Sequence, residues 1–176
     1  MEAAELVNSY FERLGEVLDT IPRQPIQDAV EAVVLATGFG RTIYFEGREA
    51  SVSTAQFVVE RLPQLLPDAV RPRLQALAIA PDAADYAGTV VFSPGDVVFI
   101  LADAMAPSVL DIAYRANRTG AVTVGLTGSA AHDLMLATDH CLVIPTSDRS
   151  TLSEMQIVVC DLIAALLSRS PPPVLP

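Results

Sequence analysis

Residues 95–128 constrain the fold more than any other part of the chain. Residues 97–101 form an unbroken apolar run, which is typical of a strand buried on both faces. Pro107 suits the first turn of a helix, and a second apolar, β-branched run follows at residues 121–126. This order predicts a βαβ unit, with two parallel strands joined by a right-handed crossover. Such sheets bind ligands at the carboxyl ends of their strands, which places residues 102–107 at the expected functional edge.

Further strands and helices are expected to alternate around this unit. The expected helices cover residues 2–20, 26–37, 52–62 with Ser51 as N-cap, 129–135 and 147–168, and the further strands cover residues 41–45, 74–79 and 141–144. This order predicts a parallel sheet of about five strands with helices on both faces, a three-layer α/β sandwich. We expect one domain over residues 1–169 and a flexible, proline-rich tail over residues 170–176.

Charge and composition exclude several classes of function. The net charge of −10 argues against binding to nucleic acid or anionic membranes, since both need a basic surface. All 11 basic residues are arginine, so no lysine can form a Schiff base or serve a Walker-type phosphate loop. No apolar run reaches the length of a membrane span, and the amino-terminal segment is acidic and amphipathic. We therefore expect a cytoplasmic protein.

The cysteine and histidine residues do not suggest a metal or redox site. Cys141 and Cys160 fall in an expected strand and helix, so we interpret them as core thiols. His132 and His140 show no metal-ligand spacing and are interpreted as residues at the surface or at a strand end.

The first helix carries an apolar stripe outside the βαβ unit. The stripe consists of residues at helical spacing: Leu6, Tyr10, Leu14, Val17 and Ile21. It can pack on its own domain or on a partner subunit. On the second interpretation the chain is a homodimer or homotetramer.

Five short pieces of sequence carry a family resemblance. They are GDVVF at 95–99, RTG at 118–120, AVTVGLTG at 121–128, LVIP at 142–145 and SEMQIVVCDLIAALL at 153–167. In their order and spacing the chain resembles the SIS (sugar isomerase) domain, over roughly residues 3–167. More closely, it is similar to the phosphoheptose isomerase group and its relative, the replication initiator-associating protein. The resemblance implies a flavodoxin-like sheet that binds phosphosugars without a nucleotide, in dimers or tetramers built through the first helices.

The resemblance also implies where a phosphosugar would bind. The family's first loop, G-N-G-G-S, falls on residues 47–51, where Gly47 and Ser51 are kept and Arg48 replaces the asparagine. Its phosphate loop, S-T-S-G-N-S, falls on residues 102–108, where Ser108 alone keeps a hydroxyl and Asp103 adds a negative charge. Two like charges about 4 Å apart at an effective dielectric of about 20 repel by about 4 kcal/mol, which one hydroxyl worth about 1 kcal/mol does not offset.

The family's metal and catalytic positions are changed in this chain. Phosphoheptose isomerases often hold zinc with His, Glu, Gln and His, and these positions fall on Phe57, Arg61, Ser153 and Asp161. The position of Arg61 is also that of the catalytic glutamate. Glu60 is a weak catalytic candidate, because one residue along a helix turns the side chain about 100° away. We therefore expect neither a metal nor another cofactor.

Three functions are compatible with this pattern. The first is a non-catalytic SIS-domain protein that works by assembly or partner binding, with a residual phosphosugar pocket. The second is an active sugar-phosphate isomerase, of the sedoheptulose 7-phosphate type, that uses rearranged residues: Arg48, Ser51, Glu60 and Ser108. The third is a binding module for another carbohydrate derivative, in which Asp103 accepts hydrogen bonds from sugar hydroxyls. On the first and third interpretations, the ligand-contacting residues are Gly47, Arg48, Ser51, Asp103 and Ser108.

Overall fold

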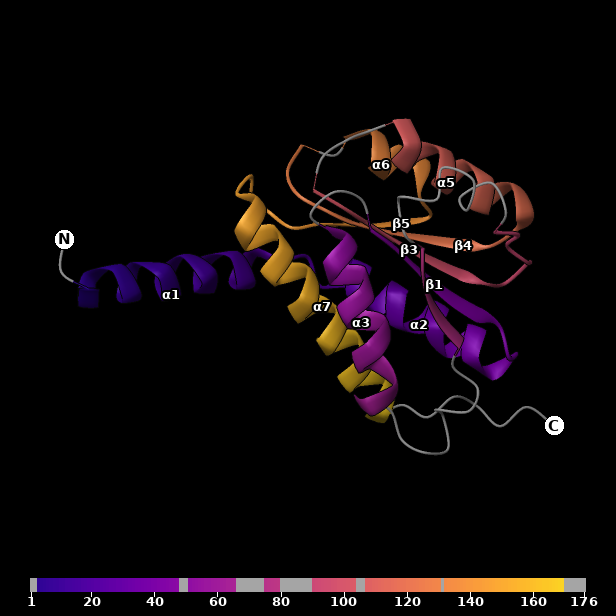
Figure 1. Cartoon of the computed structure of the whole chain (residues 1–176), viewed down its shortest axis with the longest axis horizontal. Helices are drawn as coiled ribbons and strands as arrows, with labels where there is room; N and C mark the ends of the chain where they lie inside the picture. Colours follow the sequence, from indigo (N-terminus) through magenta and orange to yellow (C-terminus); the bar gives the residue numbers. More distant parts are fainter. Residues whose placement is uncertain are drawn as a thin grey trace.

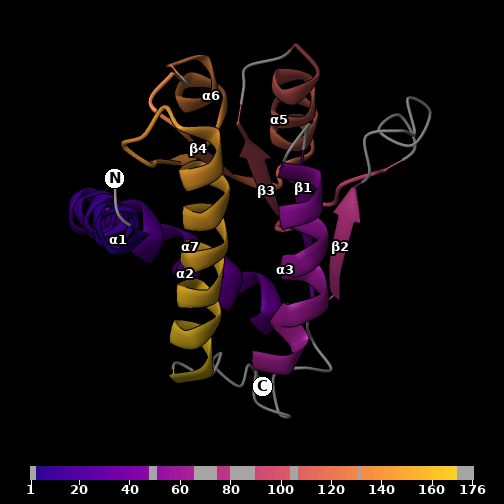
Figure 2. The same ribbon diagram turned by 60° about the vertical axis from the view of Figure 1, so that its left-hand side comes forward.

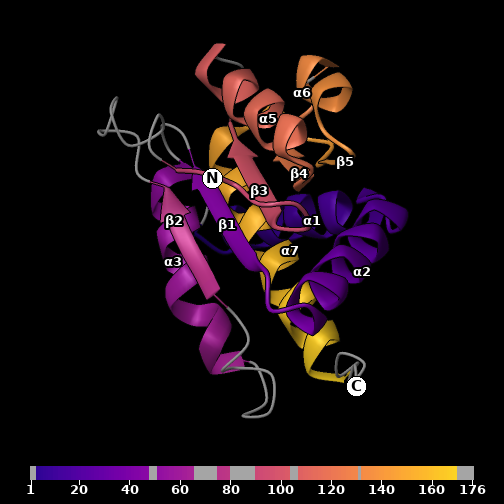
Figure 3. The ribbon, with the colours of Figure 1, turned by 90° about the vertical axis from the view of Figure 1, so that its right-hand side faces the viewer.

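One parallel sheet organises the chain in this computed structural model. The structure describes residues 3–47, 51–65, 75–79, 90–103, 107–130 and 132–169. The strands are β1 (Thr42–Gly47), β2 (Gln75–Ile79), β3 (Val97–Ala102), β4 (Val122–Thr127) and β5 (His140–Val143). They lie in the order β2-β1-β3-β4-β5, and each neighbouring pair is parallel (Figure 3).

Helices cover both faces of this sheet. They are α1 (Ala3–Thr20), α2 (Gln24–Gly38), α3 (Ser51–Leu65), α5 (Pro107–Thr119), α6 (His132–Ala137) and α7 (Arg149–Arg169). The helices α2, α3 and α7 pack on one face and α5 and α6 on the other, so two separate apolar cores form (Figure 2). The predicted layers of helices around a parallel sheet are therefore observed.

The central βαβ unit is confirmed. Val97 on β3 is in register with Val122 on β4, and the two strands run parallel. All six residues of β3 are buried, as the unbroken apolar run predicts. Phe99 of β3 stacks on Phe45 of β1 with ring centroids 4.7 Å apart, which joins the two central strands on the α7 side.

Two helix starts show how the chain shapes the functional edge. Ser51, expected as an N-cap, is the first residue of α3, so that expectation is wrong. At the start of α7, the Asp148 carboxylate accepts hydrogen bonds from the Thr151 N–H at 2.8 Å and from the Thr151 hydroxyl at 2.7 Å. These two bonds cap the helix and lower the pKa of Asp148.

The helix α1 projects from the body of the protein as an arm (Figure 1). The end of its apolar stripe packs on the chain's own core, where Val17 and Ile21 are buried and Leu14 is partly buried. Nearer the amino terminus, Leu6 is 54% exposed and Phe11 is 66% exposed. The packing of the stripe on its own domain is therefore observed for its carboxyl-terminal half, and packing of the exposed half on a partner subunit stays a prediction.

The helix α7 satisfies the length and composition of a membrane span, and is the one described helix to do so. Half of the apolar window in α7 is buried within the protein, where it packs against α2, α3 and β4. Residues 170–176, expected as a tail, lie outside the described residues.

The start of β3 offers a test of this arrangement. Asp96 is 4% exposed, and its carboxylate accepts hydrogen bonds from the backbone N–H groups of Thr42 at 3.0 Å and Ser93 at 2.7 Å. The substitution Asp96→Ala removes a buried acceptor and leaves two partly buried donors unpaired, so we expect the free energy of unfolding to fall by about 3 kcal/mol. Denaturant titration measures this loss.

The matched control is Asp111→Ala, because Asp111 is exposed on α5. We expect the control to change the free energy of unfolding by less than about 0.5 kcal/mol. A loss for Asp96→Ala no larger than that of the control would contradict the role of Asp96 in joining β1 to β3.

Candidate functional site

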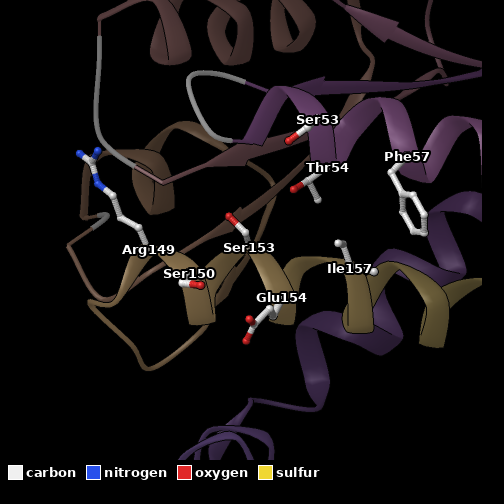
Figure 4. Close-up of a pocket in the computed structure, with 8 residues that line it drawn as sticks. All are labelled: Ser53, Thr54, Phe57, Arg149, Ser150, Ser153, Glu154 and Ile157. Atoms are coloured by element: carbon white, nitrogen blue, oxygen red, sulfur yellow. The ribbon is translucent and has the colours of Figure 1, made fainter. Parts of the chain in front are cut away.

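A groove opens between the first halves of α3 and α7, at the carboxyl edge of the sheet. Its volume is about 570 Å³, and its walls carry mostly hydroxyl-bearing and charged side chains: Ser53, Thr54, Phe57, Arg149, Ser150, Ser153, Glu154 and Ile157. Figure 4 shows Ser53 and Thr54 on α3 opposite Ser153 on α7, with Phe57 and Ile157 closing the far end. The groove is open enough to admit a small polar ligand.

The positions where the family resemblance places zinc hold an ion pair. The Arg61 guanidinium lies on α3 with its Nε 2.8 Å from Oδ1 of Asp161 on α7. The same guanidinium sits 5.5 Å from the centre of the Phe57 ring, in the geometry of a cation–π contact. The pair is partly exposed, so it adds at most about 1 kcal/mol to stability. Its chemical effect is larger, because a cation stands where a zinc ion would need electron-pair donors.

The described residues offer no other metal site. They contain no group of three or more His, Cys, Asp or Glu side chains placed to hold an ion. His132 is exposed at the start of α6, while His140 at the start of β5 has its Nδ1 3.6 Å from an Asp28 carboxylate oxygen. The donor set therefore does not fit the zinc that the resemblance would imply.

Ser51 is used inside the protein. It is fully buried, and its hydroxyl donates to Oε1 of Gln156 at 3.2 Å. The Gln156 amide in turn donates to the Leu126 carbonyl at 3.1 Å. This bridge ties α3, α7 and β4 together beneath the groove. Gly47 packs directly against the backbone of Ser51, because a Cβ atom at position 47 would overlap the Ser51 backbone carbonyl.

Glu154 connects the groove to the projecting arm. The Tyr10 hydroxyl on α1 donates to Oε1 of Glu154 at 2.6 Å, and this hydrogen bond raises the pKa of Tyr10. The other carboxylate oxygen, Oε2, is buried and has no hydrogen-bond partner in the described part of the chain. The arm is thus attached to the groove by a polar contact.

A second, smaller hollow lies where β3 and β4 end. Its volume is about 80 Å³, and it is bounded by the ends of both strands and by the segment before α7: Asp103, Thr127, Gly128, Ser129, Ala130, Thr146, Ser147 and Leu152. The Asp103 side chain is 1% exposed, and neither carboxylate oxygen has a hydrogen-bond partner among the described residues. Among the described cations, Arg149 pairs with it, with Nε 3.9 Å from Oδ2 of Asp103 and a side chain 64% exposed.

The remaining residues predicted from the sequence lie outside the groove and the hollow or outside the described residues. Arg48 lies outside the described residues. Ser108 and Glu60 are exposed on α5 and α3, and neither lines the groove or the hollow. Cys160 is buried, and burial raises its pKa to about 12, which suits an unreactive core thiol. Cys141 is half-buried, and burial raises its pKa as well.

Two buried polar residues were not identified from the sequence as site residues. Gln156 lies on the apolar face of α7, and a polar residue among its inward positions was the available signal. Glu46 is fully buried near the end of β1. The residues around it are typical of an ordinary strand, so its burial has no signal in the sequence. Both residues lie near the carboxyl edge of the sheet.

Comparison with known proteins finds similar sequences and similar folds. No family model matches the chain. The curated phosphoheptose isomerase of Maridesulfovibrio salexigens is 27% identical over 179 residues, which cover 93% of this chain and 83% of the relative. The chain also superimposes on a solved phosphoheptose isomerase from Francisella tularensis with a TM-score of 0.80, at 20% identity and covering 96% of this chain and 100% of that one.

Two further solved structures share the same fold. The Vibrio vulnificus NanR protein complexed with ManNAc-6P matches with a TM-score of 0.76 at 20% identity, covering 97% of this chain and 64% of that one. The sugar isomerase domain of an RpiR transcription factor from Sphaerobacter thermophilus matches with a TM-score of 0.70 at 18% identity, covering 96% and 90%. The chain thus has the same fold as these proteins, and it is similar in sequence to a phosphoheptose isomerase over most of its length.

Proposed function

We propose that this chain is a non-catalytic SIS-domain protein that binds a carbohydrate derivative and acts through assembly. One observation carries the proposal: Arg61 and Asp161 pair with each other at the positions where the resemblance places two zinc ligands. Arg61 also replaces the expected catalytic glutamate. Phe57 and Ser153, at the other two positions, line the groove but offer no imidazole or amide.

Aldose–ketose isomerisation requires a base and an acid held at the reacting carbons. Glu60 is exposed and lies outside the groove. Glu154 lines the groove, but one of its carboxylate oxygens already accepts the Tyr10 hydrogen bond. The side chains that remain around the groove are suited to hydrogen bonding with a polar ligand, because most of them carry hydroxyls.

The alternative is an active sugar-phosphate isomerase with a rearranged site. The relatives named phosphoheptose isomerase favour it, and so does the groove, which remains open between α3 and α7. In that case Glu154 is the described carboxylate best placed to move a proton. The NanR protein complexed with ManNAc-6P supports carbohydrate binding by this chain, since it has the same fold and is complexed with a phosphosugar.

Turnover of sedoheptulose 7-phosphate separates the two possibilities. We expect none from the purified protein, with or without added zinc, because loss of a general acid or base alone costs about a hundred- to ten-thousand-fold in rate. The Maridesulfovibrio salexigens relative, assayed in parallel, is the positive control.

The variant Arg61→Ala sharpens this assay. It removes the cation beside Phe57 and should leave the protein inactive, because no acid or base is gained. Turnover by the native protein that Arg61→Ala abolishes, or one zinc ion bound per native chain, would contradict the proposal.

Assembly is proposed to run through the α1 arms, as a homodimer or homotetramer. Five large apolar or aromatic side chains of the arm are more than a third exposed: Leu6, Val7, Tyr10, Phe11 and Leu18. An arm that projects with such residues uncovered exposes apolar area that a second arm can bury (Figure 1). Burying one large side chain of this kind contributes about 2 kcal/mol.

The substitution Phe11→Glu tests the role of the arm. We expect a dimer or tetramer by light scattering at micromolar concentration, and a shift toward the monomer mass in Phe11→Glu, because a carboxylate cannot be buried there without a partner.

The matched control is Asn8→Glu, which adds the same charge at another exposed position of α1. It should retain the native mass. A monomer mass for the native protein at micromolar concentration would count decisively against assembly through the arm.

A further inference from the structure

We propose that the hollow at the ends of β3 and β4 binds the hydroxyl-bearing end of an unphosphorylated sugar or sugar alcohol, with the Asp103 carboxylate as the acceptor. The same hollow excludes phosphate. This inference rests on the proposed carbohydrate-binding function and names the class of ligand that it takes. The phosphate that the resemblance would place at this loop does not fit the residues present.

The Asp103 carboxylate lacks the donors that a buried acid ordinarily has. Asp96, at the opposite end of the same strand, accepts two backbone N–H groups through its two oxygens. Asp103 is equally enclosed, with a 1% exposed side chain, yet neither oxygen has a hydrogen-bond partner in the part of the chain that the structure describes. Buried carboxylate oxygens without donors are rare, and a bound donor is the simplest way to satisfy them.

The walls of the hollow match a polyhydroxylated ligand. Besides Asp103, four hydroxyl-bearing residues line it: Thr127, Ser129, Thr146 and Ser147. Each hydroxyl can donate and accept, as sugar hydroxyls do. The volume of about 80 Å³ holds a few non-hydrogen atoms, such as a diol or a hydroxymethyl end, and not a whole sugar ring.

Among the residues that the structure describes around the hollow, the donors that would favour an anion are either already bonded or exposed to solvent. The Ser129 N–H donates to the Thr146 carbonyl at 3.1 Å, so it points across the wall of the hollow. Gly128 permits this close approach, because a Cβ there would lie 2.7 Å from the Thr146 carbonyl oxygen. The described cation beside the hollow, Arg149, has its Nε 3.9 Å from Asp103 and a side chain 64% exposed, so solvent weakens its field. A phosphate dianion would face the Asp103 charge at short range.

Ligand-detected NMR on the full chain tests this inference with defined probes. The polyol probes are D-mannose, N-acetyl-D-mannosamine, D-sedoheptulose and D-mannitol, and the anionic probes are inorganic phosphate, mannose 6-phosphate and sedoheptulose 7-phosphate. We expect at least one polyol to bind with a dissociation constant below about 10 mM, and every phosphate probe to bind at least about tenfold more weakly.

The variant Asp103→Asn keeps the shape of the side chain and removes its charge. We expect it to weaken polyol binding by about tenfold or more, because a charged acceptor is lost. The variant Asp103→Ser should strengthen phosphate binding by a similar factor, because the repelling charge is replaced by a hydroxyl. Asp111→Asn, the same change on the exposed face of α5, should leave both affinities unchanged.

Three results would overturn the inference. The first is that none of the polyols binds, which would leave water as the occupant of the hollow. The second is that the native protein binds a phosphate probe more tightly than any polyol, and the third is that Asp103→Asn leaves polyol binding unchanged. The native preference is measured without any variant, so a misfolded variant cannot hide it. A native preference for sugar phosphates would leave the proposed carbohydrate-binding function standing, whereas turnover of sedoheptulose 7-phosphate would contradict the non-catalytic function alone.

Discussion

The burial of β3 on both faces is the constraint on which the rest of the structure depends. All six of its residues are enclosed, with β1 and β4 paired in parallel on either side. Parallel neighbours need long crossovers, and in the described part of the chain β1, β3, β4 and β5 are each followed by a helix. The carboxyl edge of the sheet gathers the ends of β3 and β4 and the starts of α3 and α7, and both the groove and the hollow lie there.

Periodicity predicted the layers of this fold because burial patterns are local. The apolar run of β3 and the helical spacing after Pro107 each identify an element without any knowledge of its neighbours. The Ser51 cap was misplaced for the opposite reason. Its hydroxyl bonds to Gln156, 105 residues away, and no local pattern reports such a partner.

In the candidate site, too, local sequence predicted some features, and others depend on contacts between distant residues. The resemblance located Phe57, Arg61, Ser153 and Asp161 as changed positions, but only the fold shows that Arg61 and Asp161 pair with each other. The charge of Asp103 was evident from the sequence, whereas its enclosure without hydrogen-bond donors depends on how three separate segments meet. The chemical groups of a site can thus be predicted from its residue types. Whether each group is buried, paired or free can be known only from its contacts with residues far away in the sequence.

The hydrogen bond between Tyr10 and Glu154 couples the position of the arm to ligand binding in the groove. A ligand that took over the Glu154 carboxylate would remove a contact that positions α1 on the body of the protein. Linkage is reciprocal, so whatever fixes the arm in place changes the affinity of the groove by the same factor. Under the proposed function, occupancy of the groove would in this way change how the arm associates, with the Tyr10 hydroxyl as the connection.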